Sequence, residues 1–317
     1  MSDYIRPGTA AAVKGKRPLR LKKYWTLYAL GLPALAAYFV WCYLPLAGWS
    51  IAFTKFQPGK SLFANGFVGF DHFVKFFKSS SGFGMVLKNT LGINLISLLL
   101  LFVTAAAFAV AINEIALRQF GRIVQMVSFF PYFMSYVVAY AIVYALFGMK
   151  SGAVNQLLVN TGIIKTAINV LGSEKAAWPM MIILRLWKEI GYYSIIFLAS
   201  IVAIPAEESE ADAIDGAGRW QRVWHITLPN IKRIFFIMLV LQFGNIFTNS
   251  LDQFFAFSNA TNMDALTVFD MYVFRYGLLK SDYSYATAVG VIKSIVALVL
   301  LTGVNKLSKV FAETSVI

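Results

Sequence analysis

Six long apolar runs divide the sequence, at roughly residues 25–48, 86–112, 122–147, 177–203, 232–253 and 284–305. Each run is long enough to cross about 30 Å of hydrocarbon as a helix of about 20 residues. The chain is 59% hydrophobic and 14% charged, far more apolar than a soluble domain. In lipid every backbone polar group must be satisfied within the chain, which a helix achieves alone. The sequence therefore predicts an all-α, polytopic membrane protein with about six transmembrane helices.

The distribution of basic residues predicts which loops face the cytoplasm. If both termini are cytoplasmic, the inside segments hold fifteen lysines and arginines, and the much longer outside segments hold ten. Cytoplasmic loops carry such an excess, which also explains the net charge of +13 without a nucleic-acid partner. We expect a basic cytoplasmic tail over 1–23, a transmembrane domain over 24–309 and a C-terminal cytoplasmic tail over 310–317.

A polar stretch over 205–229 interrupts the apolar pattern and is expected to form a projecting elbow on the cytoplasmic side. Pro205 suits the first turn of a short helix, and the acids that follow, Glu207 and Glu208 among them, lie near its positive end. Two glycines can end that helix by tight or left-handed geometry. The residues from Trp220 onward can start a second short helix, which we expect to end at Pro229.

The same stretch carries a motif: Glu-Ala, a glycine six residues after the Glu, and Ile-x-Leu-Pro. It resembles the cytoplasmic loop of the membrane subunits of ABC importers, although the family usually has Ala where this chain has Asp212. The resemblance implies the type I permease fold and a loop that docks on an ATPase subunit. The residues assigned to this coupling loop are Glu210, Ala211, Asp212, Asp215, Gly216, Ala217, Gly218, Ile226, Leu228 and Pro229.

Further matches, over 187–199 and 270–294, resemble the branch of this family that takes up oligosaccharides and polysaccharide fragments. Membership implies a multi-pass permease, not an enzyme, in the inner membrane of a bacterium. It also implies several partners: a sister permease subunit, either identical or homologous, two ATPase subunits and an extracytoplasmic solute-binding protein. ATP and Mg would be bound by the ATPases, and this chain would carry no cofactor.

Ionisable and amide side chains inside the runs indicate a possible route for substrate, because such groups usually face a protein interior or a cavity. Arg185, Lys188, Glu189 and Tyr192 share one helical face, and Arg185 can pair with Glu189. Structural pairing and substrate contact both explain this face. The fifth run is expected to carry a second such face, with Phe243, Phe247 and Phe254 alongside its amide residues Gln242, Asn245, Asn249 and Gln253. Contact with sugar hydroxyls and a hydrogen-bonding seam between helices both explain this second face. The full set of candidates is Arg185, Lys188, Tyr192, Gln242, Asn245, Asn249, Gln253 and Lys293.

The cargo and the energy source are less constrained by the sequence. Basic residues along the route favour an acidic saccharide such as a uronic-acid oligomer, but the inside bias adds positive charge whatever the cargo. An ion-coupled sugar carrier is the alternative, and it would need paired carboxylates in the membrane, where only Glu189 is placed. A membrane enzyme such as a glycosyltransferase would need an acidic metal-binding motif at the membrane edge.

Three further features bear on the class of site. No Gly-x-x-x-x-Gly-Lys-Ser/Thr phosphate loop occurs in the chain. His72 and His225 are distant from each other and from Cys42, which argues against a zinc site. The segment from Ser50 to Lys88 is rich in phenylalanine and is expected either at the membrane interface, where aromatic side chains are common, or on a docking surface for an external partner.

Overall fold

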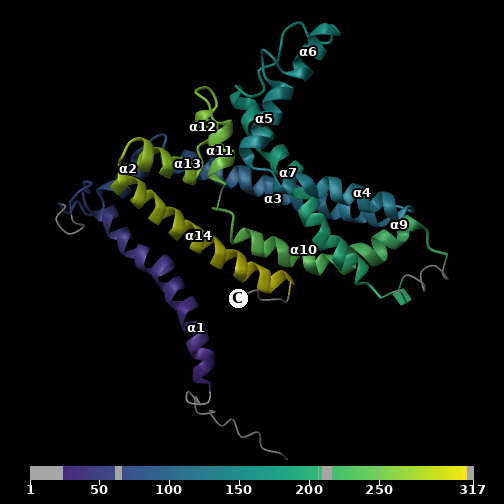
Figure 1. Cartoon of the computed structure of the whole chain (residues 1–317), viewed down its shortest axis with the longest axis horizontal. Coiled ribbons are helices and arrows are strands. Elements are labelled where there is room, and N and C mark those ends of the chain that lie inside the picture. The colour runs from purple at the N-terminus through teal and green to yellow at the C-terminus, as the bar shows by residue number, and fades with distance from the viewer. Residues whose placement is uncertain (1–23, 61–65, 206, 209–215, 249, 313–317) are drawn as a thin grey trace, which may run out of the picture. The chain divides into compact units, whose positions relative to one another are not determined.

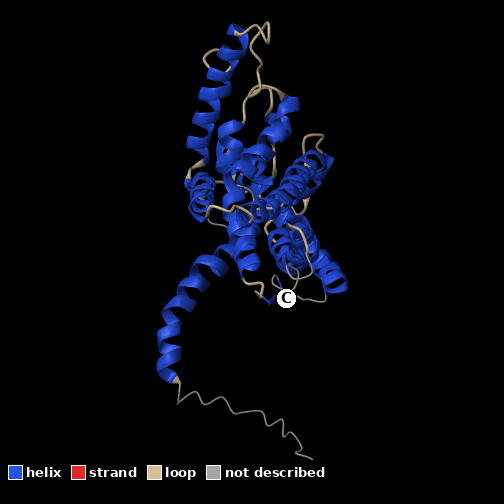
Figure 2. Cartoon of the chain, turned by 90° about the vertical axis from the view of Figure 1, so that its right-hand side faces the viewer, coloured by secondary structure: helices blue, strands red, loops and turns tan. Residues whose placement is uncertain are grey.

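The computed structural model describes residues 24–60, 66–205, 207–208, 216–248 and 250–312, and for 307–312 only the backbone. Within these ranges the chain is built from helices and loops (Figures 1 and 2). The chain divides into two units, one up to Trp49 and one from Ser50 onward.

The first unit is an apolar helix whose side chains find few partners within the chain. It comprises α1 (Trp25–Tyr38), a π-helical turn (Phe39–Tyr43) and the start of a 3-10 helix (Leu44–Phe53). Pro45 lacks the N–H that would continue the ladder, which accounts for the change of helix type just before it. In α1 no side chain is buried, as expected for a helix that faces lipid or another subunit.

The second unit is organised around two long helices, α3 (Phe83–Asn113) and α7 (Glu174–Val202). Ala105 and Ala109 of α3 are fully buried, and these small side chains allow neighbouring helices to approach closely. Phe102 lies beside Phe197 of α7, with ring centroids 6.0 Å apart. This aromatic and alanine contact forms the centre of one of three hydrophobic clusters.

Two more helices complete this framework, α10 (Leu228–Phe243) and α14 (Tyr283–Ala312). In the described part of the chain, four helices are long and apolar enough to cross a membrane, or five if one bent pair counts as a span. The 29-residue α7 is long enough too, but it carries charged residues in its middle. The expected all-helical membrane fold is confirmed, and six is an approximate count of its spans.

The third expected run is not one helix but a broken one. It consists of α4 (Arg118–Phe129), a 3-10 turn (Phe130–Phe133) and α5 (Tyr136–Phe147), and its two parts differ in direction by 107°. Pro131 starts the 3-10 turn, and the Ser135 hydroxyl accepts a hydrogen bond from the Val138 amide at 3.3 Å. This cap starts a new helix in a new direction.

The fifth expected run, 232–253, is not one helix. The helix α10 ends at Phe243, and a separate short helix, α11 (Leu251–Phe257), follows a turn. Gly244 and Asn245 interrupt the apolar pattern at the break, and both residue types favour turns over helix interiors. The prediction of a continuous helix was therefore wrong at this point.

Short helices fill the connections between these spans. They are α2 (Asp71–Lys78), α6 (Ala153–Asn160), α9 (Arg219–Arg222), α12 (Met263–Leu266) and α13 (Phe269–Phe274), with π-helical turns at Val223–Thr227 and Arg275–Leu279. The helix α6 lies in the connection between α5 and α7, where the sequence predicts a re-entrant or surface hairpin, and it extends away from α3 and α10 (Figure 1).

Candidate coupling segment and transport route

The predicted coupling loop is described at its two ends. Glu210, Ala211, Asp212 and Asp215 lie outside the described residues. Gly216 has a φ of +76°, in the left-handed region that glycine adopts without strain. Ala217 follows it, and Gly218 then begins α9 with an ordinary φ of −71°.

The helix that begins at Gly218 continues further than expected. The Gln221 side chain accepts a hydrogen bond from the Gly218 amide at 2.7 Å, which caps the first turn. A continuous helix then runs from Arg219 to Phe243, so Pro229 does not end it. Pro229 has no N–H and cannot make the backbone hydrogen bond of a regular helix. The π-helical turn that precedes it, Val223–Thr227, accommodates this irregularity without ending the helix.

One hydrogen bond joins the two ends of the coupling loop. Asn230 donates through Nδ2 to Oε2 of Glu208 at 3.0 Å, and the same amide lies 3.1 Å from the Ile226 carbonyl oxygen. Glu208 follows Pro205 and precedes the motif that starts at Glu210, whereas Asn230 comes directly after Pro229. The contact restrains the start of the predicted coupling loop against α10. The sequence analysis did not single out Asn230.

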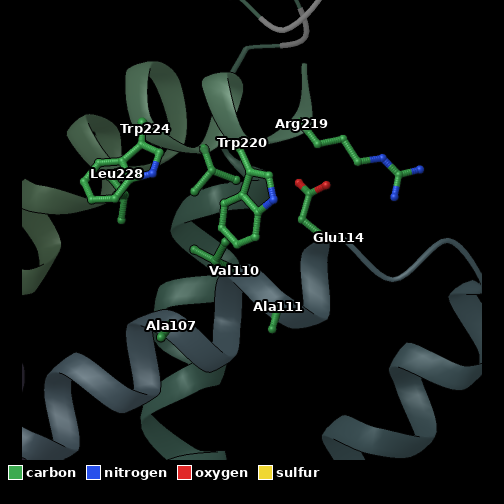
Figure 3. Close-up of a pocket in the computed structure, with 9 residues that line it drawn as sticks. Ala107, Val110, Ala111, Glu114, Arg219, Trp220, Trp224 and Leu228 are labelled. Atoms are coloured by element: carbon green, nitrogen blue, oxygen red, sulfur yellow. The ribbon is translucent and has the colours of Figure 1, made fainter. Parts of the chain in front are cut away.

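An apolar groove lies beside this segment, at the C-terminal end of α3 (Figure 3). Its volume is about 510 Å³, and Trp220 and Trp224 form part of its wall with exposed fractions of 77% and 66%. Glu114 and Arg219 lie at its edge (Figure 3). Tryptophan is enriched at membrane boundaries, so this end of α3 lies near one.

The charged face of α7 forms a compact polar cluster. Arg185 donates from Nε to Oε2 of Glu189 at 3.2 Å, as the spacing of four predicts. The same guanidinium donates from Nη1 to Oδ1 of Asn94, on α3, at 3.3 Å. Glu189 is therefore neutralised by a neighbour on its own helix, and the paired carboxylates of an ion-coupled carrier are not found at this position.

Lys188 points instead toward the broken helix between α4 and α5. Its side chain is buried, with 8% of the residue exposed, and Nζ donates to the carbonyl oxygen of Tyr132 at 2.6 Å. The same nitrogen lies 5.0 Å from the centre of the Tyr136 ring, in cation–π range. The break leaves the Tyr132 carbonyl outside a helical ladder, which makes it available as an acceptor.

Aromatic rings are stacked beside this lysine. The rings of Tyr192 and Tyr132 are 4.5 Å apart and differ by 7° in plane. Phe129 continues the stack, 5.9 Å from Tyr132 with an interplanar angle of 8°. Sequence reasoning placed Tyr192 here but did not assign Tyr132 or Phe129 to the route. The aromatic run that contains them is evident in the sequence, but its position beside α7 is set by the fold and cannot be read from the sequence.

The second expected face is not assembled as predicted. Gln242 belongs to α10 and Asn245 to the turn after it, whereas Gln253 belongs to α11. Asn249 lies outside the described residues. Gln253 is buried and donates to the Met181 carbonyl oxygen at 3.3 Å, so it joins α11 to α7. The prediction of one continuous polar face is wrong because the helix breaks at Gly244.

The aromatic residues of that face have a packing role. Phe247 and Phe254 are each 2% exposed and belong to two different hydrophobic clusters. Rings buried in this way are not available to stack on a substrate.

Lys293 forms an ion pair outside the α7 cluster. It contacts Asp270 of α13, and both side chains are about a quarter exposed. Nearby on the chain, Arg275 donates to the hydroxyls of Thr267 and Ser258 at 2.9 and 3.0 Å. The Lys293–Asp270 pair joins α14 to α13, whereas the two Arg275 bonds tie the turn after α13 to residues that follow α11 and precede α13. Ionisable groups within membrane helices are commonly paired in this way.

The two histidines make local contacts with the backbone. His72 Nε2 lies 3.2 Å from the Thr54 carbonyl oxygen, and His225 Nδ1 lies 2.9 Å from that of Gln221.

Comparison with known proteins decides the family. The family described as "Binding-protein-dependent transport system inner membrane component" matches residues 102–313. The chain belongs to this family. The sequence-based assignment to the membrane permease subunits of ABC importers is confirmed, and the coupling ends, the α7 cluster and Lys293 all fall within the matched range.

Individual relatives extend the likeness over almost the whole chain. This permease is 35% identical to the "Polygalacturonan/rhamnogalacturonan transport system permease protein YteP" of Bacillus subtilis (strain 168), over 92% of this chain and 89% of the relative. It is 26% identical to the "Arabinooligosaccharides transport system permease protein AraP" of the same organism, over 96% and 95%.

Solved structures show the same fold. A chain from the crystal structure of a bacterial alginate ABC transporter, in complex with an alginate pentasaccharide-bound periplasmic protein, superposes with a TM-score of 0.84. The two chains are 31% identical, and the match covers 93% of this permease and 98% of the other chain. A second structure is described as a transporter "involved in the import of the acidic polysaccharide alginate", with a TM-score of 0.83 and 32% identity over 92% and 97%.

Proposed function

We propose that this permease moves an oligosaccharide or polysaccharide fragment, acidic in character, into the cell by alternating access driven by ATP. The observation that carries the proposal is the α7 cluster, where the buried cation of Lys188 lies beside the stacked rings of Tyr132 and Tyr192. Relatives named for polygalacturonan and for alginate, the latter called acidic, support the same class of cargo.

The chemistry of the cluster suits such a cargo. Aromatic rings offer flat apolar faces to the C–H faces of a sugar ring, and charged donors bind carboxylates with shorter and stronger hydrogen bonds than neutral donors. Arg185 and Lys188 supply the charged donors, seven and four residues before Tyr192 and on the same helical face. In the present arrangement both side chains are engaged within the protein. A carboxylate of an anionic sugar would therefore replace the carbonyl oxygen of Tyr132 as the acceptor for Lys188.

The rest of the machine is proposed to consist of partner chains. A sister permease, identical or homologous, would complete the route, and a solute-binding protein would deliver the saccharide from outside. Two ATPases that bind ATP and Mg would dock on the 205–229 elbow, with both termini of this chain in the cytoplasm. The Glu208–Asn230 contact supports this role because it restrains the elbow against α10. Closure of the ATPases would favour one of the two access states.

The substrate half of the proposal is tested in the complete importer, reconstituted in liposomes with its binding protein. In the Lys188→Gln variant we expect an about tenfold weaker stimulation of ATP hydrolysis and uptake by an acidic oligosaccharide, equal to about 1.4 kcal/mol. A neutral oligosaccharide that the binding protein accepts should be affected much less. The control is Lys150→Gln, which removes a positive charge from an exposed outer residue.

Two results would contradict the proposal. One is equal loss for acidic and neutral cargo, which would assign Lys188 a structural role. The other is uptake that a proton or sodium gradient drives without ATP, which would favour an ion-coupled carrier.

A further inference from the structure

The short helix α2 (Asp71–Lys78) contacts the ends of two membrane helices. Phe53 is the last residue of the apolar helix Trp25–Phe53, and its ring centroid lies 5.2 Å from that of Phe73. Phe83 is the first residue of α3, and its ring lies 4.8 Å from that of Phe77. A bilayer-spanning helix starts or ends near the edge of the hydrocarbon, so both contacts place α2 at that edge.

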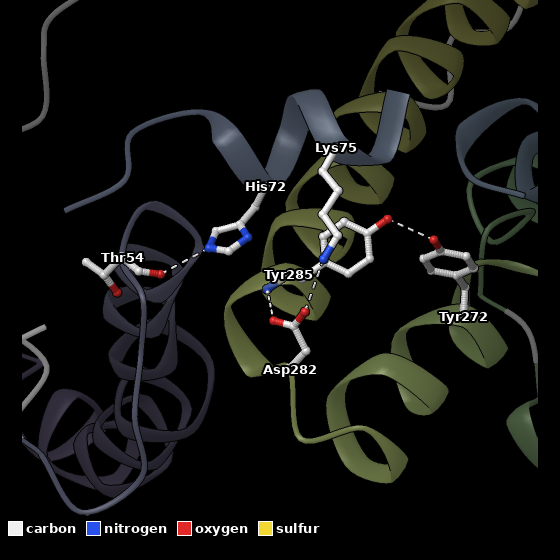
Figure 4. A network of polar contacts seen from close by, with 6 residues as sticks. All are labelled: Thr54, His72, Lys75, Tyr272, Asp282 and Tyr285. Atoms are coloured by element: carbon white, nitrogen blue, oxygen red, sulfur yellow. Dashed lines mark hydrogen bonds and ion pairs between the residues drawn. The ribbon is translucent and has the colours of Figure 1, made fainter. Parts of the chain in front are cut away.

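A third membrane helix, α14, contacts α2 with its N-terminal end (Figure 4). Lys75 pairs with Asp282 at 3.5 Å, directly before α14 begins, and its Nζ lies 4.4 Å from the centre of the Tyr285 ring. The Tyr285 hydroxyl is 2.8 Å from that of Tyr272 on α13, and burial and this hydrogen bond raise the pKa of Tyr272. The helix α2 is therefore held firmly against the first turn of α14.

The side chains of α2 separate into three faces. Phe73 and Phe76 pack into a hydrophobic cluster of the protein, and Phe76 is fully buried. Asp71, Lys75 and Lys78 are exposed polar residues. This leaves a third face, which is both apolar and exposed.

The exposed apolar face runs along one side of the helix. It consists of Phe70, just before the helix, Val74 and Phe77, with exposed fractions of 67%, 44% and 56%. Spacings of four and three residues place these side chains in one stripe. Phe70 and Phe77 also touch the rings of Phe53 and Phe83, but much of each side chain stays uncovered. A helix with a polar face toward water and an exposed apolar face has the pattern of an interfacial membrane helix.

We infer that α2 lies in the headgroup region of the bilayer and inserts Phe70, Val74 and Phe77 toward the acyl chains of phospholipids. The site is at the N-terminal end of α3, opposite to the groove of Trp220 and Trp224, so it belongs to the membrane surface away from the coupling segment. The ion pair of Lys75 with Asp282 keeps the charged side of the helix at the aqueous boundary. The helix thus lies at the membrane surface beside the first turns of α3 and α14, and this position does not depend on the transported cargo.

The experiment measures what surrounds single positions on α2 in the complete importer, reconstituted in phosphatidylglycerol and phosphatidylcholine vesicles. Because Cys42 is the single cysteine, a Cys42→Ser background allows one new thiol at a time. Val74→Cys is the principal variant because it makes a small change on the exposed face, and Phe70→Cys is the second. Ser80→Cys, at an exposed polar residue just after the helix, is the matched control. Each thiol carries an environment-sensitive fluorophore, and its quenching by spin-labelled phospholipids and by aqueous iodide is compared.

We expect the labels at positions 74 and 70 to be quenched by the spin-labelled lipids at least twofold more than the label at position 80. Iodide should give the reverse order. Preferential quenching by iodide at 74 and 70 would overturn the inference. Protection from both quenchers would also overturn it, because a protein partner such as the solute-binding protein would then cover the face. Uptake by each variant confirms that the complex is intact.

Discussion

Single residues of the coupling segment have conformations that constrain substitution. Gly216 adopts a left-handed φ of +76°, and among the described residues no atom lies within 4 Å of the position that a Cβ would take. Any cost of a side chain therefore comes from the backbone and not from a clash. Gly218, two residues further, has an ordinary φ of −71°, and a Cβ there would lie 3.5 Å from Oε1 of Gln221, an ordinary van der Waals contact. The two positions form a natural pair for testing the role of the turn.

We predict that Gly216→Val impairs coupling and that Gly218→Ala does not. A β-branched residue in the left-handed region costs about 1–3 kcal/mol, so the loop would adopt another conformation. Transport and the association with the ATPases should fall by about tenfold or more, while the thermal unfolding of the membrane part changes little. Copurification of the ATPases and uptake in vesicles measure the effect. Normal uptake by Gly216→Val would count heavily against a rigid coupling elbow.

At this scale the sequence predicted contacts along one helix and missed contacts between helices. The pair of Arg185 and Glu189 follows from a spacing of four on one helix. The partner of Lys188 does not, because Tyr132 is 56 residues away and becomes available only through the break between α4 and α5. The turn at Gly216 was readable because left-handed geometry selects glycine strongly.

At the scale of elements, α7 and α4 touch backbone to backbone. A Cβ on Gly191 would lie 2.2 Å from the carbonyl oxygen of Ser128, far inside van der Waals contact. We predict that Gly191→Ala forces the two helices apart, at a cost of about 1–3 kcal/mol, and lowers the unfolding temperature in detergent by several degrees.

The matched control is Gly290→Ala on α14, where nothing lies within 4 Å of the new Cβ. Alanine is the better helix former by about 1 kcal/mol, so this variant should unfold at the same temperature or slightly higher. The order of the two unfolding temperatures is the measurement. Equal values would mean that the close approach at Gly191 is absent in the membrane.

The connection around α6 depends on one buried amide. Asn155 donates through Nδ2 to the carbonyl oxygens of Phe147, Gly148 and Ile168, and its Oδ1 accepts from the Ile168 amide at 3.0 Å. We predict that Asn155→Ala loosens this connection, because buried backbone groups left without partners cost about 1–3 kcal/mol each. Amide hydrogen exchange over 148–170 should accelerate by about tenfold or more, while α3 stays protected.

Exposed Leu157 on the same helix offers the control for that experiment. Leu157→Ala removes more apolar surface but breaks no hydrogen bond of the connection, so exchange over 148–170 should stay near the wild-type rate. Similar rates in Asn155→Ala and Leu157→Ala would contradict the assigned role of the amide. The sequence showed an asparagine-rich mixed segment here, but the carbonyls that Asn155 bridges lie up to thirteen residues away.

At the scale of the whole molecule, some parts of this membrane fold can be predicted from the sequence and others cannot. Continuous apolar runs predicted α3 and α14 well, because hydrocarbon thickness and backbone hydrogen bonding dictate their length and type. The breaks at Pro131 and Gly244 were underestimated, since a run can stay apolar while its helix changes direction. The break at Pro131 lies beside α7, where Lys188 binds the Tyr132 carbonyl, whereas the break at Gly244 lies beside Leu301 of α14. Breaks in membrane helices are tolerated where neighbouring helices satisfy the freed backbone groups.

That arrangement leads to a prediction about the complete importer. If the α7 cluster lies on the transport route, its exposure to each side of the membrane must depend on the nucleotide state of the ATPases. In a Cys42→Ser background, Tyr192→Cys should react with a membrane-impermeant thiol reagent at rates that differ by about tenfold between the nucleotide-free complex and the complex trapped with ATP and vanadate. Ser80→Cys, outside the route, should react at the same rate in both states. A Tyr192→Cys rate that does not change with nucleotide would remove the cluster from the route and leave the stack of Tyr132 and Tyr192 as a structural contact. The direction of the change would identify which access state the described arrangement of α4, α5 and α7 represents.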